Sequence, residues 1–176
     1  MSEAGAPWSA SVTLAEVDRG PVTLALAPDA QARAGLARML DLVALDKLEA
    51  EVRLAPWLDG AELTADWRAV IVQTCGLSLE TFDTVLEGAF TVRVVPPGSL
   101  HAPSAEAEID LDPDAEDSPD LLEGTTIDAA AYVVEQLALE IDPFPRKPGI
   151  EFEPPPPDEV PSPFAVLAAR WSEPKA

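Results

Sequence analysis

Three long stretches of alternating apolar and polar residues constrain the fold of this chain more than any other feature. The first runs from Leu48 to Leu54, the second from Leu63 to Ile71 and the third from Phe82 to Val94. Successive side chains of a strand point to opposite faces, so each stretch predicts a strand with one buried and one solvated face. That pattern is typical of antiparallel sheets. With only short connections between them, the three strands predict a meander.

Turn residues and shorter alternations extend this prediction. Asp59-Gly60 lies between the first two long stretches and favours a tight hairpin, whose central residues need positive φ. Shorter alternations at Trp8–Val12 and Val22–Leu26 predict two more strands.

Two segments have the spacing of amphipathic helices. The first follows Pro28-Asp29, and its apolar residues recur at offsets of four, seven, eight and eleven. The second covers about 128–140, with Thr125 and Thr126 as candidates for its N-terminal cap. The sequence therefore predicts an α+β fold, a meandering antiparallel sheet of about five to seven strands with two packed helices. Closure of the sheet toward a barrel remains open at this point.

The domain is expected to span residues 8–142, followed by a proline-rich tail over 143–176. The tail holds ten of the nineteen prolines, and Pro154 to Pro157 favour an extended spacer. Beyond the spacer we expect a short helix with Phe164, Leu167 and Trp171 on one face. These apolar residues either dock on the sheet or bind a groove on a partner.

Charge limits the classes of partner. The chain has 32 acidic and 11 basic residues, a formal net charge of −21. Because nucleic-acid binding depends on neutralising phosphates, such a chain is on average repelled by RNA, DNA and anionic membranes. Basic proteins are the natural partners, although acidity could also serve solubility alone. Thirteen acids and no base lie between Arg93 and Arg146, and we expect a mobile acidic loop over about 97–122, with a short strand at 107–111.

Catalytic motifs are absent from the sequence. It has no glycine-rich phosphate loop, no nucleophile elbow and no paired-cysteine site, so we expect no enzyme, no cofactor and no metal. A hydrolase would need Cys75 or His101 beside a carboxylate, and this stays a third hypothesis. Without an N-terminal leader or an apolar run of membrane length, a cytoplasmic location is expected.

Several motifs occur in a characteristic order. RAVIVQTC stands at 68–75, FTVRVVP at 90–96, DPFPRKPG at 142–149 and SPFAVLA at 162–168. In this order they resemble the YceD family, the large ribosomal RNA subunit accumulation proteins. The resemblance implies a non-catalytic factor in large-subunit biogenesis. Many members carry a C-x-x-C-like cluster where this chain has Cys75 alone.

Two modes of action follow. In the first, the protein binds a basic ribosomal protein or assembly factor and reaches ribosomal RNA indirectly. Its binding residues would be the acids of the loop and the apolar residues of the tail: Glu106, Glu108, Asp110, Asp112, Asp114, Glu116, Asp117, Phe164, Leu167 and Trp171. In the alternative, the protein binds ribosomal RNA directly through a local basic patch made of Arg68, Arg93, Arg146 and Lys147.

Overall fold

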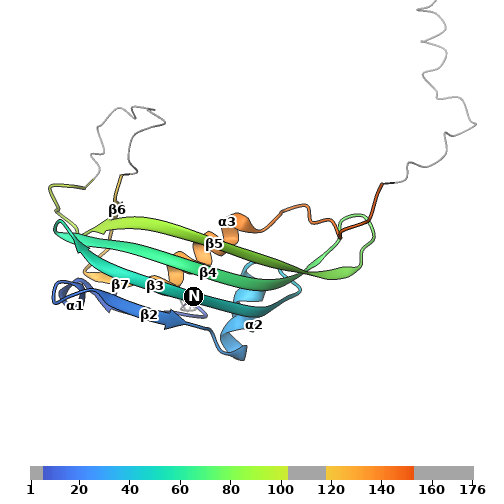
Figure 1. The fold of residues 1–176 in the computed structure, drawn as a ribbon, viewed down its shortest axis with the longest axis horizontal. Helices are drawn as coiled ribbons and strands as arrows, with labels where there is room; N and C mark the ends of the chain where they lie inside the picture. Colours follow the sequence, from blue (N-terminus) through green and yellow to red (C-terminus); the bar gives the residue numbers. More distant parts are fainter. Residues whose placement is uncertain (1–5, 103–117, 153–176) are drawn as a thin grey trace, which may run out of the picture.

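The computed structural model describes residues 6–102 and 118–152 (Figure 1). It has a five-stranded sheet in the order β2-β3-β4-β5-β6 and a two-stranded sheet of β1 and β7. The elements are β1 (Ser11–Thr13), α1 (Leu14–Val17), β2 (Val22–Leu26), α2 (Ala30–Met39), β3 (Ala44–Trp57), β4 (Gly60–Thr74), β5 (Thr81–Val95), β6 (Asp120–Leu121), β7 (Thr126–Asp128) and α3 (Ala129–Glu140). The predicted α+β meander is therefore confirmed.

The larger sheet is open, so closure toward a barrel is wrong. Closure requires the first and last strands to pair with each other. Here β2 pairs with β3 alone, and the two-residue β6 pairs in parallel with the end of β5. The outer strands are too short and too far apart in the strand order to complete a barrel.

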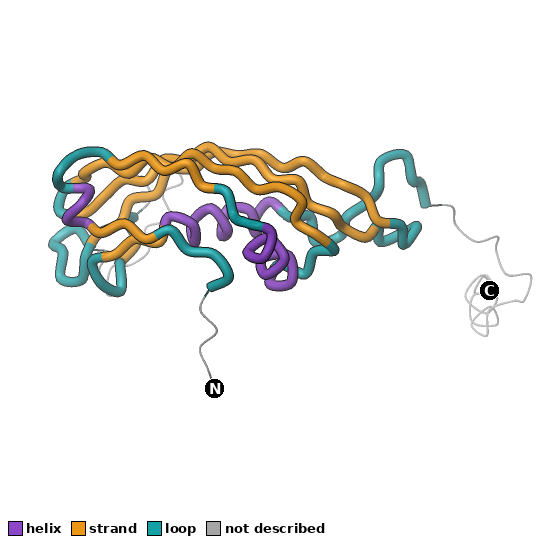
Figure 2. The backbone as a smooth tube through the Cα atoms, turned by 90° about the horizontal axis from the view of Figure 1, so that it is seen from below, coloured by secondary structure: helices purple, strands orange, loops and turns teal. Residues whose placement is uncertain are grey.

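The three long strands hold the core. The register of β3 with β4 runs from Trp57 opposite Gly60 to Ala44 opposite Val72, and that of β4 with β5 from Ala61 opposite Val94 to Thr74 opposite Thr81. On the inner face the predicted apolar rows of β3 and β4 are buried, with Leu54, Leu63 and Ile71 fully inaccessible. Figure 2 shows the sheet arching over α2 and α3, which cover this face. Burial of these side chains away from water is the main stabilising term.

Aspartates and one threonine begin the helices. Asp29 accepts a hydrogen bond from the amide of Ala32 at 2.8 Å and caps α2. Asp128, rather than Thr125 or Thr126, caps α3, because Thr126 is already paired within β7. The Asp128 carboxylate also accepts a hydrogen bond from the amide of Ala10 at 2.8 Å, which ties the N-terminal segment to α3.

The hairpin between β3 and β4 differs in detail from the prediction. Its two connecting residues are Leu58 and Asp59, and Leu58 has the positive φ, 51°. Gly60 instead begins β4, where an added Cβ would lie 1.9 Å from the carbonyl oxygen of Val94. Glycine is required there for close approach of the strands and not for the turn.

Some expectations lie outside the described residues, namely the strand at 107–111 and the tail helix with Phe164. Within the segment expected to be loop, β6 pairs with β5 at Val94 and Val95. In the part of the chain that the structure describes, no helix is long and apolar enough to cross a membrane.

Replacing Gly60 tests this packing. Gly60→Ala is expected to lower the free energy of unfolding by about 1–3 kcal/mol, because backbone must move to admit the methyl group. The matched control is Gly124→Ala, since a Cβ there meets nothing within 4 Å, and its effect should stay within about 0.5 kcal/mol. Urea unfolding of both variants measures the difference. Equal stabilities would contradict the close approach of β4 and β5.

Candidate functional site

The outer face of the sheet is the largest charged surface of the described structure. Along β3, β4 and β5 the residues between the buried ones are mostly exposed and many are charged. The register places Arg68 between Glu49 and Glu87, and Glu51 opposite Asp66. Acids from three neighbouring strands therefore lie side by side, which concentrates negative potential on one face.

A groove of about 720 Å³ lies at the centre of this charged surface. Its lining extends from Ala25 of β2 to Gly88 of β5, and its charged members are Glu49, Glu51, Asp66, Arg68 and Glu87. Four carboxylates against one guanidinium make it acidic. We call these five residues, with the groove between them, the acidic face.

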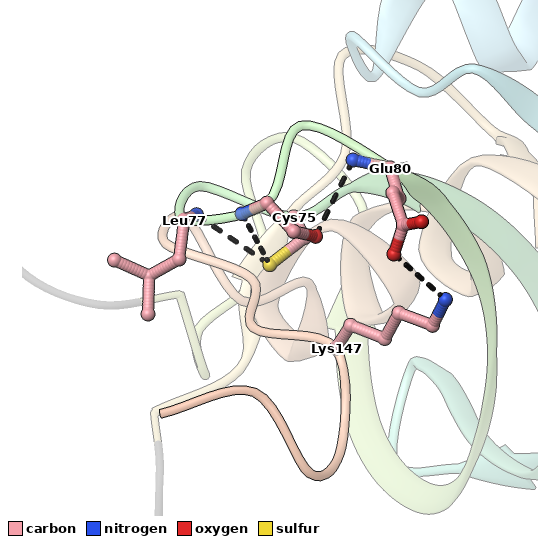
Figure 3. A network of polar contacts seen from close by, with 5 residues as sticks. Cys75, Leu77, Glu80 and Lys147 are labelled. Atoms are coloured by element: carbon pink, nitrogen blue, oxygen red, sulfur yellow. Dashed lines mark hydrogen bonds and ion pairs between the residues drawn. The ribbon is translucent and has the colours of Figure 1, made fainter. Parts of the chain in front are cut away.

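A second polar site lies at the turn between β4 and β5, where residues 142–147 pack against the hairpin (Figure 3). Pro145 accepts a hydrogen bond from the amide of Gly76 at 2.9 Å, and the Gln73 side chain donates to the carbonyl of Asp142 at 3.1 Å. The Lys147 ammonium pairs with Glu80 at 3.0 Å. These contacts hold the start of the predicted tail against the sheet.

Cys75 lies fully buried inside this turn. Its Sγ accepts hydrogen bonds at 3.4 Å from the amides of Leu77 and Ser78. Hydrogen bonds from the Ser78 hydroxyl, the Ser78 amide and the Lys147 amide lower the pKa of the Cys75 thiol to about 6, against the opposing effect of burial. The groups that contact Sγ are donors that stabilise a thiolate, and this serves the packing of 142–147 against the turn.

The four basic residues of the RNA hypothesis lie apart along the sheet. Arg93 lies near the β3–β4 hairpin, Arg68 at the middle of β4, and Lys147 and Arg146 beside the β4–β5 turn. Arg93 and Lys147 are separated by roughly thirteen strand residues, about 40 Å.

Arg93 is engaged within the protein. Its Nε donates to Glu62 at 3.0 Å, and its guanidinium lies 5.1 Å from the centroid of the Trp57 ring. Arg68 is exposed in the acidic face.

The acids and apolar residues of the first hypothesis, Glu106 to Asp117, Phe164, Leu167 and Trp171, lie outside the described residues. The sequence argument did not select Glu49, Glu51, Asp66 and Glu87 as binding residues. The information was present, because the alternation that predicts the strands also places these acids on one face. Among the described residues, no group of three or more His, Cys, Asp or Glu side chains is arranged to hold a metal ion.

Comparison with known families gives one match. The family described as "Large ribosomal RNA subunit accumulation protein YceD" matches residues 63–168, which include β4, β5 and α3. No curated protein and no solved structure matches the chain.

The lowered thiol pKa predicts a pH dependence of stability. Because the folded pKa lies below the ordinary value of 9.0, the thiolate contributes stability that is fully present above the unfolded pKa. That contribution is lost as the pH falls toward 6. The stability difference between the natural protein and Cys75→Ala should therefore be larger at pH 9 than at pH 6, measured by urea unfolding. A difference that is constant with pH would show that the thiol titrates alike in both states.

Arg93 and Arg68 are expected to differ in their contribution to stability. Arg93→Ala removes a half-buried ion pair and a cation–π contact, and should cost about 1 kcal/mol. Arg68→Ala, at an exposed position of the neighbouring strand, should change stability by less than about 0.5 kcal/mol. Thermal and urea unfolding of the two variants provide the comparison. A larger loss for Arg68 would assign the structural role to the wrong arginine.

Proposed function

The chain belongs to the YceD family, and from this premise we propose that it acts as a non-catalytic factor that binds a basic ribosomal protein or assembly factor. The family description implies a role in the accumulation of large-subunit ribosomal RNA. The family match is the observation that carries the pathway. The chemistry of the partner is inferred from charge.

Two features support a basic protein as the partner. The net charge is −21, so the long-range field attracts cationic proteins and repels RNA. In addition, the acidic face gathers four carboxylates from three strands around one groove. Opposite fields of this kind raise the association rate and select against anionic competitors.

The proposed mechanism is electrostatic shielding. A ribosomal protein carries many lysines and arginines before it meets RNA, and an acidic surface can cover them until RNA displaces it. The acids between Glu106 and Asp117 would add to this field, and Phe164, Leu167 and Trp171 would supply apolar anchors. Cytoplasmic assembly and action without catalysis belong to the same proposal.

Direct RNA binding through Arg68, Arg93, Arg146 and Lys147 is the less favoured mode. It requires basic side chains to cluster on one surface. Their spread along the sheet, and the ion pairs of Arg93 with Glu62 and of Lys147 with Glu80, support the acidic mode instead.

In vivo cross-linking distinguishes the two modes. A tagged copy is cross-linked in growing cells, and both the recovered RNA and the recovered proteins are sequenced. We expect large-subunit precursors recovered through a basic protein, with little direct cross-linking to RNA. Strong direct cross-links to ribosomal RNA would favour the basic residues, and recovery of neither would contradict the proposed function.

Neutralising the acidic face should slow binding. The variant Glu49→Gln, Glu51→Gln, Asp66→Asn, Glu87→Gln keeps the size of each side chain but removes four negative charges. Association with the cross-linked basic protein is expected to slow by about tenfold at low salt, with a flatter dependence on salt.

The control variant loses four exposed acids elsewhere: Asp18→Asn, Glu123→Gln, Glu140→Gln and Glu151→Gln. Stopped-flow kinetics compare both variants with the natural protein. If the two variants slow association equally, net charge alone acts, and the acidic face has no special part.

A further inference from the structure

The outer edge of β5 is open along most of its length. On one side β5 pairs with β4 through the whole register from Thr81 to Val94. On the other side, within the described residues, its only strand partner is β6, which pairs with Val94 and Val95. Residues 81–93 therefore present an unpaired edge of about 40 Å, along which roughly every second residue turns its N–H and C=O outward.

This edge lacks the usual protection against strand addition. Natural edge strands are short, or carry a bulge, a proline or a lysine. Residues 81–93 contain no proline and no lysine, and their register with β4 is continuous. The other open edge, at the start of β3, has a bulge between Leu45 and Lys47 and carries Lys47 itself. β5 is thus the edge that is left able to accept a strand.

The two faces of β5 define what an added strand must look like. On the inner face Leu86, Phe90 and Val92 are only partly buried, although they pack on the core. On the outer face Asp83 and Glu87 are exposed, and Glu87 borders the acidic face. A strand beside β5 would cover the apolar row with its own apolar residues, and place the residues between them next to the acids. It should therefore alternate apolar and basic side chains.

We propose that the edge of β5 at residues 81–93 binds an extended segment of a basic protein as an additional strand of the sheet. Backbone hydrogen bonds provide affinity in this mode, and the alternating side chains provide specificity. The inference rests on the proposed function, which it deepens by assigning the binding surface and the form of the partner. A second copy of the chain is disfavoured because each copy has a charge of −21.

The test uses the full chain and synthetic peptides of about ten residues, a length that spans most of the edge. In the test peptide lysine and valine alternate, and in the control peptide the same residues occur in pairs, so the charge is equal. Hydrogen exchange is followed with and without each peptide. We expect the alternating peptide to protect amides of residues 81–93 and to bind about tenfold more tightly than the control peptide.

Two variants locate the contact on β5. Asp83→Lys should weaken binding of the alternating peptide by about tenfold, because it reverses a charge on the outer face of the edge. Its matched control is Asp18→Lys, which makes the same change at an exposed site in the turn before β2 and should alter binding less than twofold. Leu86→Lys places an inward lysine at the edge and should abolish strand addition. Unchanged exchange of β3 and β4 amides shows that this variant is folded.

Several results would overturn the inference. Equal binding of the two peptides would reduce the interaction to charge. Protection confined to residues 44–49 would transfer the site to β3. Amides of residues 81–93 that are already protected in the free protein would indicate another occupant: a second copy if protection rises with concentration, or the chain's own tail if deletion of 153–176 removes it. In each case, in vivo recovery of large-subunit precursors through a basic protein would leave the proposed function standing.

Discussion

The pairing of β4 with both of its neighbours positions every other part of the described structure. β4 is matched to β3 on one side and to β5 on the other over most of its fifteen residues. A shift of the register by one residue would exchange the buried and solvated faces of a strand, so the apolar rows fix the register. The helices, the β1–β7 pair and the segment 142–147 then pack where this sheet allows.

One consequence is that the two faces have different roles. The inner face is filled by apolar side chains under α2 and α3, and therefore has little freedom to vary. The outer face carries no covering layer within the described residues, and its charges lie in water. The same strands that build the core therefore also hold Glu49, Glu51, Asp66 and Glu87 in fixed positions. A rigid arrangement of charges loses less conformational entropy on binding than a flexible one.

Much of the described fold could be predicted from alternation alone. The buried rows of β3 and β4, the strand at Val22–Leu26 and helices near 30–39 and 129–140 all follow from apolar spacing. Contacts between distant parts of the sequence could not be predicted in this way. The pairing of β1 with β7 and the parallel pairing of β6 with β5 depend on tertiary packing, and β6 has only two residues. The short helix α1 had a local indication, the capping box of Thr13 and Glu16, which the analysis of apolar spacing passed over. For the candidate site, the sequence indicated the sign of the charge, whereas the groove required the register of three strands.

Photo-cross-linking from a defined position tests the central claim most directly. Val85 lies on the outer face of β5 and is 51% exposed, so a photoreactive residue in its place would face a partner bound to this side of the sheet. The account predicts that this position, in growing cells, becomes linked to a basic protein of large-subunit assembly, while the exposed Leu100 position does not. A covalent link from the Val85 position to ribosomal RNA, or equal capture of the same protein from both positions, would contradict it.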